Sequence, residues 1–243
     1  MGNEMLTISN LNAGYGKLQI LHDLDLTVTR GQFVAILGPN GSGKSTLLKS
    51  IFGLTDLYTG TIVLGNTQLG GLPTERIGSH GIAYVPQRAN IFTTMTVREN
   101  LLLALRNRQR TERAALLAQA YELFPVLAER PHQRAGQLSG GQRQMVAIAL
   151  GWLTQPTVMM LDEPSAGLAP IVVTEVFRTL QRLCATGITL VVVEQNARSL
   201  LRWCDYAYIL REGQIAFQGS AAAILADEET VKSYLGIATP PRI

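Results

Sequence analysis

A glycine-rich stretch sets the narrowest limits on the fold of this chain of 243 residues. It follows an apolar run, residues 33–37, that is typical of a strand buried on both faces, and it precedes the helix-like residues 46–51. Its pattern is Gly-x4-Gly-Lys-Ser, and its residues are Gly38, Pro39, Asn40, Gly41, Ser42, Gly43, Lys44 and Ser45. Glycines let a backbone wrap around an anion, and a helix that begins there offers free N–H groups. The pattern therefore predicts a strand–loop–helix unit that binds a nucleoside triphosphate.

The side chains at the end of this loop suit ATP and Mg²⁺. Lys44 can reach the β- and γ-phosphates, and the Ser45 hydroxyl can bind Mg²⁺. Thr46 stands at the start of the helix and belongs to the same expected ATP-binding set. We therefore expect ATP and Mg²⁺ as cofactors, with Lys44 acting in catalysis as well as in binding.

Composition narrows the class of protein. Hydrophobic residues make up 47% of the chain and charged residues only 16%, which favours one large domain. The net charge of +3 comes from scattered Lys and Arg, so we expect no nucleic-acid partner. Cys184 and Cys204 match neither a metal pattern nor a disulfide framework, and we expect both to be buried packing residues in a reducing compartment.

The ends and the apolar runs argue against direct membrane insertion. The first five residues lack the basic start and apolar run of a signal peptide. No apolar run approaches the roughly 18 residues that a membrane helix requires. We therefore expect any role at a membrane to pass through another protein.

Strand-like and helix-like segments alternate along the chain and predict an α/β fold. Residues 6–8 and 24–28 alternate apolar and polar side chains, as half-buried antiparallel strands do. Buried strand-like runs at residues 157–161 and 188–193 flank a helical pattern at residues 171–185. This order favours a parallel sheet with crossover helices.

A helical stretch interrupts this α/β pattern. Residues 96–128 are rich in Leu, Ala, Arg and Glu, with Thr96 or Thr111 as possible N-caps. We therefore expect a single domain, residues 1–243, in which residues 88–155 form an inserted helical subdomain and residues 1–87 and 156–243 form the nucleotide-binding core.

Two carboxylates, Asp162 and Glu163, end the apolar run at residues 158–161. Asp162 can hold Mg²⁺ directly or through a water, and Glu163 can polarise the attacking water as general base. Alone, the pair would be a common acidic strand end. With a phosphate loop in the same chain, it predicts ATP hydrolysis.

A second glycine turn lies between the phosphate loop and the acidic pair. It consists of Ser139, Gly140, Gly141 and Gln142, and an apolar helix-like run follows it. Ser139 is a good N-cap, and the glycines expose N–H groups at the helix start, which makes this a second possible anion site. The alternative is a plain helix cap.

With Leu138 before it, this turn resembles the signature of ABC-type ATPases. The resemblance implies a P-loop NTPase fold, with a RecA-like parallel-sheet core, an N-terminal antiparallel β subdomain and the inserted helical subdomain. It implies that Tyr15 stacks on adenine and that Gln87 senses Mg²⁺ and water. It also implies that two cassettes pack head to tail, so that Ser139 to Gln142 would serve the partner's nucleotide.

Three further stretches resemble a narrower group, the shorter ATPase subunit of branched-chain amino-acid importers. They are residues 162–170, 194–197 and 233–236. This resemblance implies an ATP-hydrolysing subunit that powers uptake of branched-chain amino acids. Its partners would be permease subunits, a second ATPase subunit and, indirectly, a periplasmic binding protein. Its place would be the cytoplasmic face of the plasma membrane, as a peripheral protein.

Two positions depart from the wider family. Gln195 stands where most members place a histidine that contacts the γ-phosphate, and Ala169 replaces an aspartate. A glutamine can donate a hydrogen bond but cannot become a cation. Gln195 is therefore our third catalytic candidate, and we expect slower hydrolysis here than at a companion site with a histidine.

Several alternatives stay open from the sequence. The cargo could be urea, amides or another small nitrogen compound. The chain could instead be a soluble ABC ATPase or a nucleotide-gated subunit with little turnover. Tyr15 could be a plain surface tyrosine. Residues 89–95, with Ile91 and Phe92, could contact a permease or simply pack in the core.

Overall fold

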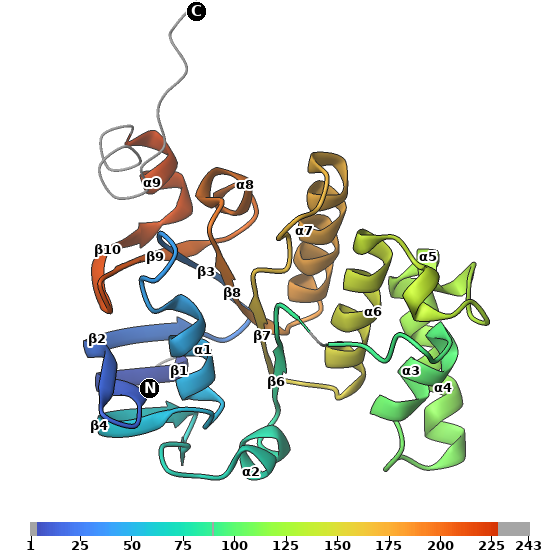
Figure 1. The fold of residues 1–243 in the computed structure, drawn as a ribbon, viewed down its shortest axis with the longest axis horizontal. Helices are drawn as coiled ribbons and strands as arrows, with labels where there is room; N and C mark the ends of the chain where they lie inside the picture. The colour runs from blue at the N-terminus through green and yellow to red at the C-terminus, as the bar shows by residue number, and fades with distance from the viewer. Residues whose placement is uncertain (1–3, 89, 228–243) are drawn as a thin grey trace, which may run out of the picture.

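The computed structural model describes residues 4–88 and 90–227 as two β-sheets with helices around them (Figure 1). The main sheet has six strands, in the spatial order β10 (Gln214–Ser220), β9 (Tyr206–Arg211), β3 (Phe33–Leu37), β8 (Thr189–Glu194), β7 (Val158–Asp162) and β6 (Ile82–Val85). Neighbouring strands are parallel, except that β10 is antiparallel to β9. The loops after β3, β6, β7 and β8 therefore leave from one edge, where α/β sheets bind ligands.

A smaller sheet confirms the predicted antiparallel β subdomain. Its spatial order is β2 (Leu18–Thr29), β1 (Glu4–Tyr15), β4 (Asp56–Leu64) and β5 (Thr67–Gln68), and every pairing is antiparallel. Ile8 pairs with Leu26, which places the two half-buried runs seen in the sequence side by side.

Helices cover both sheets. They are α1 (Lys44–Ile51), α2 (Thr74–Ser79), α3 (Val97–Ala104), α4 (Arg110–Leu123), α5 (Pro125–Ala128), the 3-10 helix η1 (Ala135–Gln137), α6 (Gly140–Leu153), α7 (Pro170–Ala185), α8 (Ala197–Leu201) and α9 (Ala221–Ala226). In Figure 1, α3 to α6 gather on the side away from the antiparallel sheet. This grouping supports a helical subdomain, whose limits at residues 88 and 155 stay a prediction.

Only one of the two expected N-caps is correct. The Thr96 hydroxyl accepts a hydrogen bond from the Glu99 N–H at 3.1 Å, and the Thr96 N–H donates to the Glu99 carboxylate at 2.8 Å, which is a capping box. The prediction for Thr111 was wrong, because Thr111 lies inside α4. That helix begins one residue earlier, with Gln109 as its N-cap, and Arg108 and Glu112 form an exposed ion pair with an N–O distance of 3.0 Å across its start.

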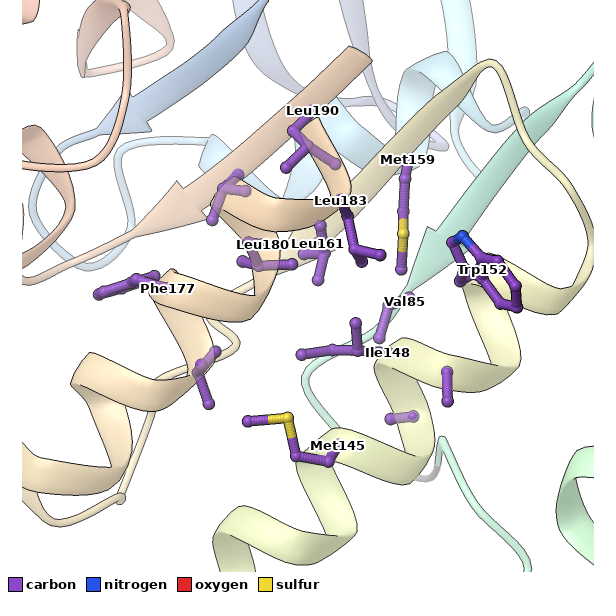
Figure 2. Packing of buried hydrophobic residues seen from close by; sticks show 14 of the residues in the cluster. Val85, Met145, Ile148, Trp152, Met159, Leu161, Phe177, Leu180, Leu183 and Leu190 are labelled. Atoms are coloured by element: carbon purple, nitrogen blue, oxygen red, sulfur yellow. The ribbon is translucent and has the colours of Figure 1, made fainter. Parts of the chain in front are cut away.

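The inner strands β3, β7 and β8 of the main sheet are buried on both faces. Phe33, Ala35 and Leu37 belong to one apolar cluster, while Val34 and Ile36 belong to another. Figure 2 shows side chains of α6 and α7 packed over β6, β7 and β8, including Ile148 over Val85 and Leu161. This two-sided packing confirms the prediction for residues 33–37 and makes the loop edge of the sheet a rigid support.

Cys184 and Cys204 are less buried than the sequence led us to expect. Cys184 and Cys204 are unpaired and pack against the core, but both are only half-buried because they lie at the end of α7 and in the loop before β9. Burial raises the pKa of Cys184 to about 11 and that of Cys204 to about 12. Neither thiol therefore ionises readily near neutral pH.

Candidate functional site

The phosphate loop joins β3 to α1 and requires glycine at several positions. Gly41 and Gly43 have φ angles of 80° and 102°, which side-chain-bearing residues rarely adopt. A Cβ at Gly38 would collide with the Leu210 carbonyl oxygen of β9. The Gly213 N–H donates to the Ser42 carbonyl at 3.0 Å, so the β9–β10 turn also supports the loop. The sequence thus folds here into a tight backbone cradle against the sheet.

The N-terminus of α1 points its amides into this cradle. Gly43 is the N-cap and, having no side chain, forms no side-chain cap. N–H groups at an uncapped helix start, together with the helix dipole, favour an anion. The Ser42 hydroxyl is buried and has no hydrogen-bond partner, as is fitting for a donor that a phosphate oxygen would satisfy. These features fit a bound phosphate chain.

Lys44 is buried and folds back over its own loop. Its Nζ donates to the carbonyl oxygens of Gly38 at 2.9 Å and Pro39 at 3.0 Å, and it lies 3.9 Å from Glu163 Oε1. Desolvation by burial lowers the pKa of Lys44, while the nearby carboxylates of Glu163, Asp162 and Glu194 oppose that shift. The lysine therefore stands between the phosphate loop and the acidic pair.

The Ser45 hydroxyl donates to Asp162 Oδ1 at 2.8 Å, and the Tyr84 hydroxyl donates to Asp162 Oδ2 at 3.2 Å. The sequence predicted Ser45 and Asp162 but missed Tyr84, which lies in β6 and follows no recognisable pattern. Desolvation by burial and the Asp162 carboxylate raise the pKa of Tyr84, so its hydroxyl keeps its proton and stays a donor. Hydrogen bonds from α1 and β6 thus fix the Asp162 carboxylate at the end of β7.

The side-chain oxygens of Ser45 and Asp162 suit a Mg²⁺ ion that is also bound by phosphate oxygens. Within the described part of the chain, no three His, Cys, Asp or Glu side chains gather in a way that could hold a metal by themselves. Mg²⁺ commonly takes one or two protein oxygens and completes its shell with phosphate and water. Ser45 and Asp162 could provide those protein oxygens, with Gln87 nearby.

Glu163 occupies the turn directly after β7. Its Oε2 accepts a hydrogen bond from Gln87 Nε2 at 2.8 Å, so two residues predicted for the site lie in contact. Its backbone φ is 46°, an uncommon value for a residue with a side chain. The carboxylate thus faces Lys44 on one side and Gln87 on the other.

A cleft of about 650 Å³ brings Gln87, Glu163 and Gln195 together with part of the phosphate loop. Its lining comprises Ile20, Asn40, Gly41, Gly43, Lys44, Ser45, Thr46, Gln87, Glu163, Ala166 and Gln195. Gln195, in the loop after β8, therefore lies beside the phosphate loop as expected for the position that meets a γ-phosphate. Ile20 was not predicted, because a lone isoleucine carries no chemical signal.

Tyr15 lies at the end of β1 and is 42% exposed. The turn after it is held by two contacts with β4: the Gly16 N–H donates to Asp56 Oδ2 at 2.6 Å, and the Tyr58 hydroxyl donates to the Gly16 carbonyl at 2.9 Å. Tyr15 is outside the lining of the 650 Å³ cleft. Its stacking on adenine stays a prediction.

The second glycine turn lies apart from this cleft. Ser139 is the N-cap of α6, its hydroxyl accepting from the Gln142 N–H at 3.3 Å and its own N–H donating to Gln142 Oε1 at 3.0 Å. Ser139 and Gly140 are exposed, whereas a Cβ at Gly141 would collide with Val172 of α7. None of the four residues lines the cleft around Lys44. The geometry is that of a helix cap at the surface, and anion binding at this turn stays a prediction.

Comparison with known proteins decides the family. A sequence profile of the ABC transporter family matches residues 21–166, more than half of the chain. The high-affinity branched-chain amino acid transport ATP-binding protein BraG of Pseudomonas aeruginosa is 39% identical over 232 residues, which cover 96% of this chain and 100% of that protein. The chain belongs to the ABC transporter family. Its members are ATPases, and so is this chain.

Other relatives of this ABC ATPase agree. The probable branched-chain amino acid transport ATP-binding protein LivF of Archaeoglobus fulgidus is 41% identical, covering 96% of this chain and 99% of that protein. The solved ATP-binding cassette MJ1267 in its ADP conformation has a TM-score of 0.84 at 28% identity, covering 96% of this chain and 99% of that one.

In residues 4–88 and 90–227, no helix combines the length and apolarity needed to cross a bilayer.

Proposed function

We propose that this chain is the ATP-hydrolysing subunit of an importer of branched-chain amino acids. One observation carries the proposal: relatives named for this transport share 39% and 41% of their residues with nearly the whole chain. The contacts of Lys44, Asp162 and Glu163 support it, because Lys44 and Glu163 line one cleft and Asp162 is hydrogen-bonded to Ser45, which also lines that cleft.

In the proposed mechanism, Lys44 leaves its own loop carbonyls and binds the β- and γ-phosphates of ATP. The loop amides and the Ser42 hydroxyl bind the other phosphate oxygens. Ser45, Asp162 and Gln87 would hold Mg²⁺, which would neutralise negative charge on the phosphates. Tyr15 stacks on the adenine.

Glu163 acts as general base in this proposal. Its carboxylate accepts a proton from the water that attacks the γ-phosphorus, while Gln87 fixes the direction of that carboxylate through the 2.8 Å hydrogen bond. Gln195 donates a hydrogen bond to the γ-phosphate. Because Gln195 stays neutral, hydrolysis at this site is slower than at a companion site that has a histidine.

A partner cassette completes the site. The exposed turn of Ser139, Gly140, Gly141 and Gln142 serves the nucleotide held by a second ATPase subunit, and the turn of that subunit serves the nucleotide on Lys44. The geometry supports this arrangement, because the turn is absent from the lining of the cleft around Lys44.

A permease docks on the segment after Gln87. Within it, Phe92 is 60% exposed, and the buried Asn100 of α3 clamps its backbone by accepting from the Phe92 N–H at 2.8 Å and donating to the Phe92 carbonyl at 2.9 Å. These hydrogen bonds hold the Phe92 backbone so that its side chain lies at the surface, where a permease can contact it. The chain thereby sits peripherally at the cytoplasmic face of the membrane, and a periplasmic binding protein delivers the cargo to the permeases.

Uptake in cells tests this function. A strain that lacks the gene should lose uptake of labelled leucine and regain it with the wild-type chain but not with Lys44→Ala. Lys49→Ala, which changes a partly exposed lysine of the same helix, is the matched control and should restore uptake. Loss of urea or amide uptake with normal leucine uptake would contradict the proposal that the cargo is branched-chain amino acids. Co-purification of permeases with the wild-type chain would support the transporter assignment, and co-purification with export permeases alone would contradict it.

A further inference from the structure

Glu163 sits in a backbone conformation that needs external support. Its φ of 46° lies in the left-handed region, which costs conformational energy for a residue with a side chain. Such a conformation persists only where neighbouring contacts hold it. The direction of the Glu163 carboxylate therefore depends on what ties down the turn of residues 162–166.

Two contacts from β8 tie down this turn. The Glu163 N–H donates to the Val193 carbonyl at 2.9 Å, which extends the β7–β8 ladder by one residue. Two residues later, the Ser165 N–H donates to Glu194 Oε1 at 2.8 Å. The backbone of Glu163 is thus anchored on both sides, and the second anchor is a side chain.

Glu194 is an unusual residue for its place. It ends an otherwise apolar strand and is only 2% exposed. A buried carboxyl is costly unless hydrogen bonds satisfy it, so packing alone would favour an apolar side chain here. Hydrogen bonds from Ser165 and from the Gln195 backbone lower its pKa, although burial outweighs them. Glu194 therefore contacts both the turn after Glu163 and the residue expected to meet the γ-phosphate.

We infer that Glu194 is a positioning residue: it holds the turn that aims Glu163 and joins that turn to the loop of Gln195. The inference rests on the proposed role of Glu163 as general base. A change at Glu194 that removes the acceptor should misplace Glu163 without disturbing the phosphate loop. Turnover should then fall while ATP binding persists.

Substitutions of graded severity test the inference in the full chain assembled with its partner subunits. Glu194→Leu removes the acceptor at nearly constant size, Glu194→Asp withdraws it by one methylene, and Glu194→Gln keeps an acceptor oxygen in place. The matched control is Thr189→Val, at the other end of β8, which removes a buried hydroxyl that accepts from the Gly31 N–H at 2.9 Å. Phosphate release is measured in a complex whose companion ATPase subunit is inactivated, so that only the Lys44 site contributes, and the Kd of a fluorescent ATP analogue is measured for each variant.

We expect kcat to fall roughly 10- to 100-fold in Glu194→Leu, because small misplacements of a catalytic group cost that much. The kcat of Glu194→Asp should lie between those of wild type and Glu194→Leu. Glu194→Gln and Thr189→Val should keep kcat within about threefold of wild type. The Kd should change little in all four. If Glu194→Leu is not recovered folded, Glu194→Asp carries the test.

Glu163→Gln is assayed in parallel, so that a wrong role for Glu163 can be told apart from a wrong role for Glu194. Wild-type turnover in Glu163→Gln would overturn the role of Glu163, and with it the premise of this inference. Loss of turnover in Glu163→Gln together with normal kcat in both Glu194→Leu and Glu194→Asp would overturn the inference alone. Equal losses of kcat in Glu194→Gln and Glu194→Leu would also overturn it, since the glutamine retains the acceptor.

Discussion

Gln87 donates a hydrogen bond from Nε2 to Oε2 of Glu163 at 2.8 Å. The two residues follow β6 and β7, neighbouring parallel strands that lie 76 residues apart in the chain at this point. The contact joins the segment proposed to face a permease to the carboxylate proposed to activate water. A change in one is therefore expected to alter the other.

Gln87→Leu tests this link. Without the amide, the Glu163 carboxylate loses one of the contacts that orient it, so we expect kcat for ATP hydrolysis to fall roughly tenfold or more. Binding of ATP without Mg²⁺ should stay within about threefold of wild type, because the phosphate loop is unchanged. Asn90→Ala is the control, since its amide donates to the Pro86 carbonyl at 3.0 Å and does not touch Glu163. Unchanged kcat in Gln87→Leu would show that the hydrogen bond has no role in turnover.

Gln195→His tests the explanation for slow hydrolysis. Gln195 lines the cleft with Lys44 and Glu163, so a histidine there can bring a positive charge toward the γ-phosphate. We expect turnover at this site to rise several-fold near pH 6.5, where an unperturbed histidine is partly charged. Steady-state phosphate release by a complex whose companion ATPase subunit is inactivated measures it. A variant with turnover equal to or below wild type would refute the proposed limitation.

Tyr84→Phe tests the support of the Mg²⁺ site. The change deletes the hydroxyl that donates to Asp162 Oδ2 at 3.2 Å and keeps the ring, whose centroid lies 5.6 Å from that of Phe52. Residues behind a metal ligand commonly matter about tenfold or more, so we expect a comparable rise in the Mg²⁺ concentration for half-maximal hydrolysis. Tyr58→Phe is the control, as its hydroxyl bonds the Gly16 carbonyl instead. The same Mg²⁺ requirement in both variants would contradict the role of Tyr84.

Glu194 should give the fold a measurable pH dependence. Burial raises its pKa from 4.5 to about 7. Between these values the folded chain retains a proton that the unfolded chain has released, so the free energy of unfolding falls as pH rises through this window. Glu194→Gln cannot titrate. We therefore expect the stability of wild type relative to Glu194→Gln, from urea unfolding, to decline between pH about 4.5 and about 7 and to level off above. A pH-independent difference would contradict this.

Local patterns predicted much of the fold. The apolar run of residues 33–37 coincides with β3, and Thr96 and Ser139 cap helices as their spacing indicated. Thr111 failed because α4 begins at Arg110, so that Gln109 and not Thr111 is the N-cap. The late resemblance at residues 233–236 lies outside the described residues.

Tyr84 and Glu194, which the sequence did not predict for the site, both make contacts with residues far away in the chain. Tyr84 reaches Asp162 across 78 positions and Glu194 reaches Ser165 across 29. Both contacts depend on the register of parallel strands, which follows from packing of the whole sheet. Glu194 did carry a local signal, a carboxyl at the end of an apolar strand, whereas Tyr84 looked like ordinary strand core.

The most direct test of hydrolysis at this site uses a complex in which only this chain carries Glu163→Gln. Phosphate release and ATP binding are measured for that complex. The glutamine keeps the size of the side chain and an acceptor for Gln87, but it cannot take a proton from water. We predict that the variant binds ATP like wild type and that hydrolysis on its Lys44 site stops. Turnover of the variant at the full wild-type rate, with ATP bound, would show that the site built on Lys44 and Glu163 does not hydrolyse ATP.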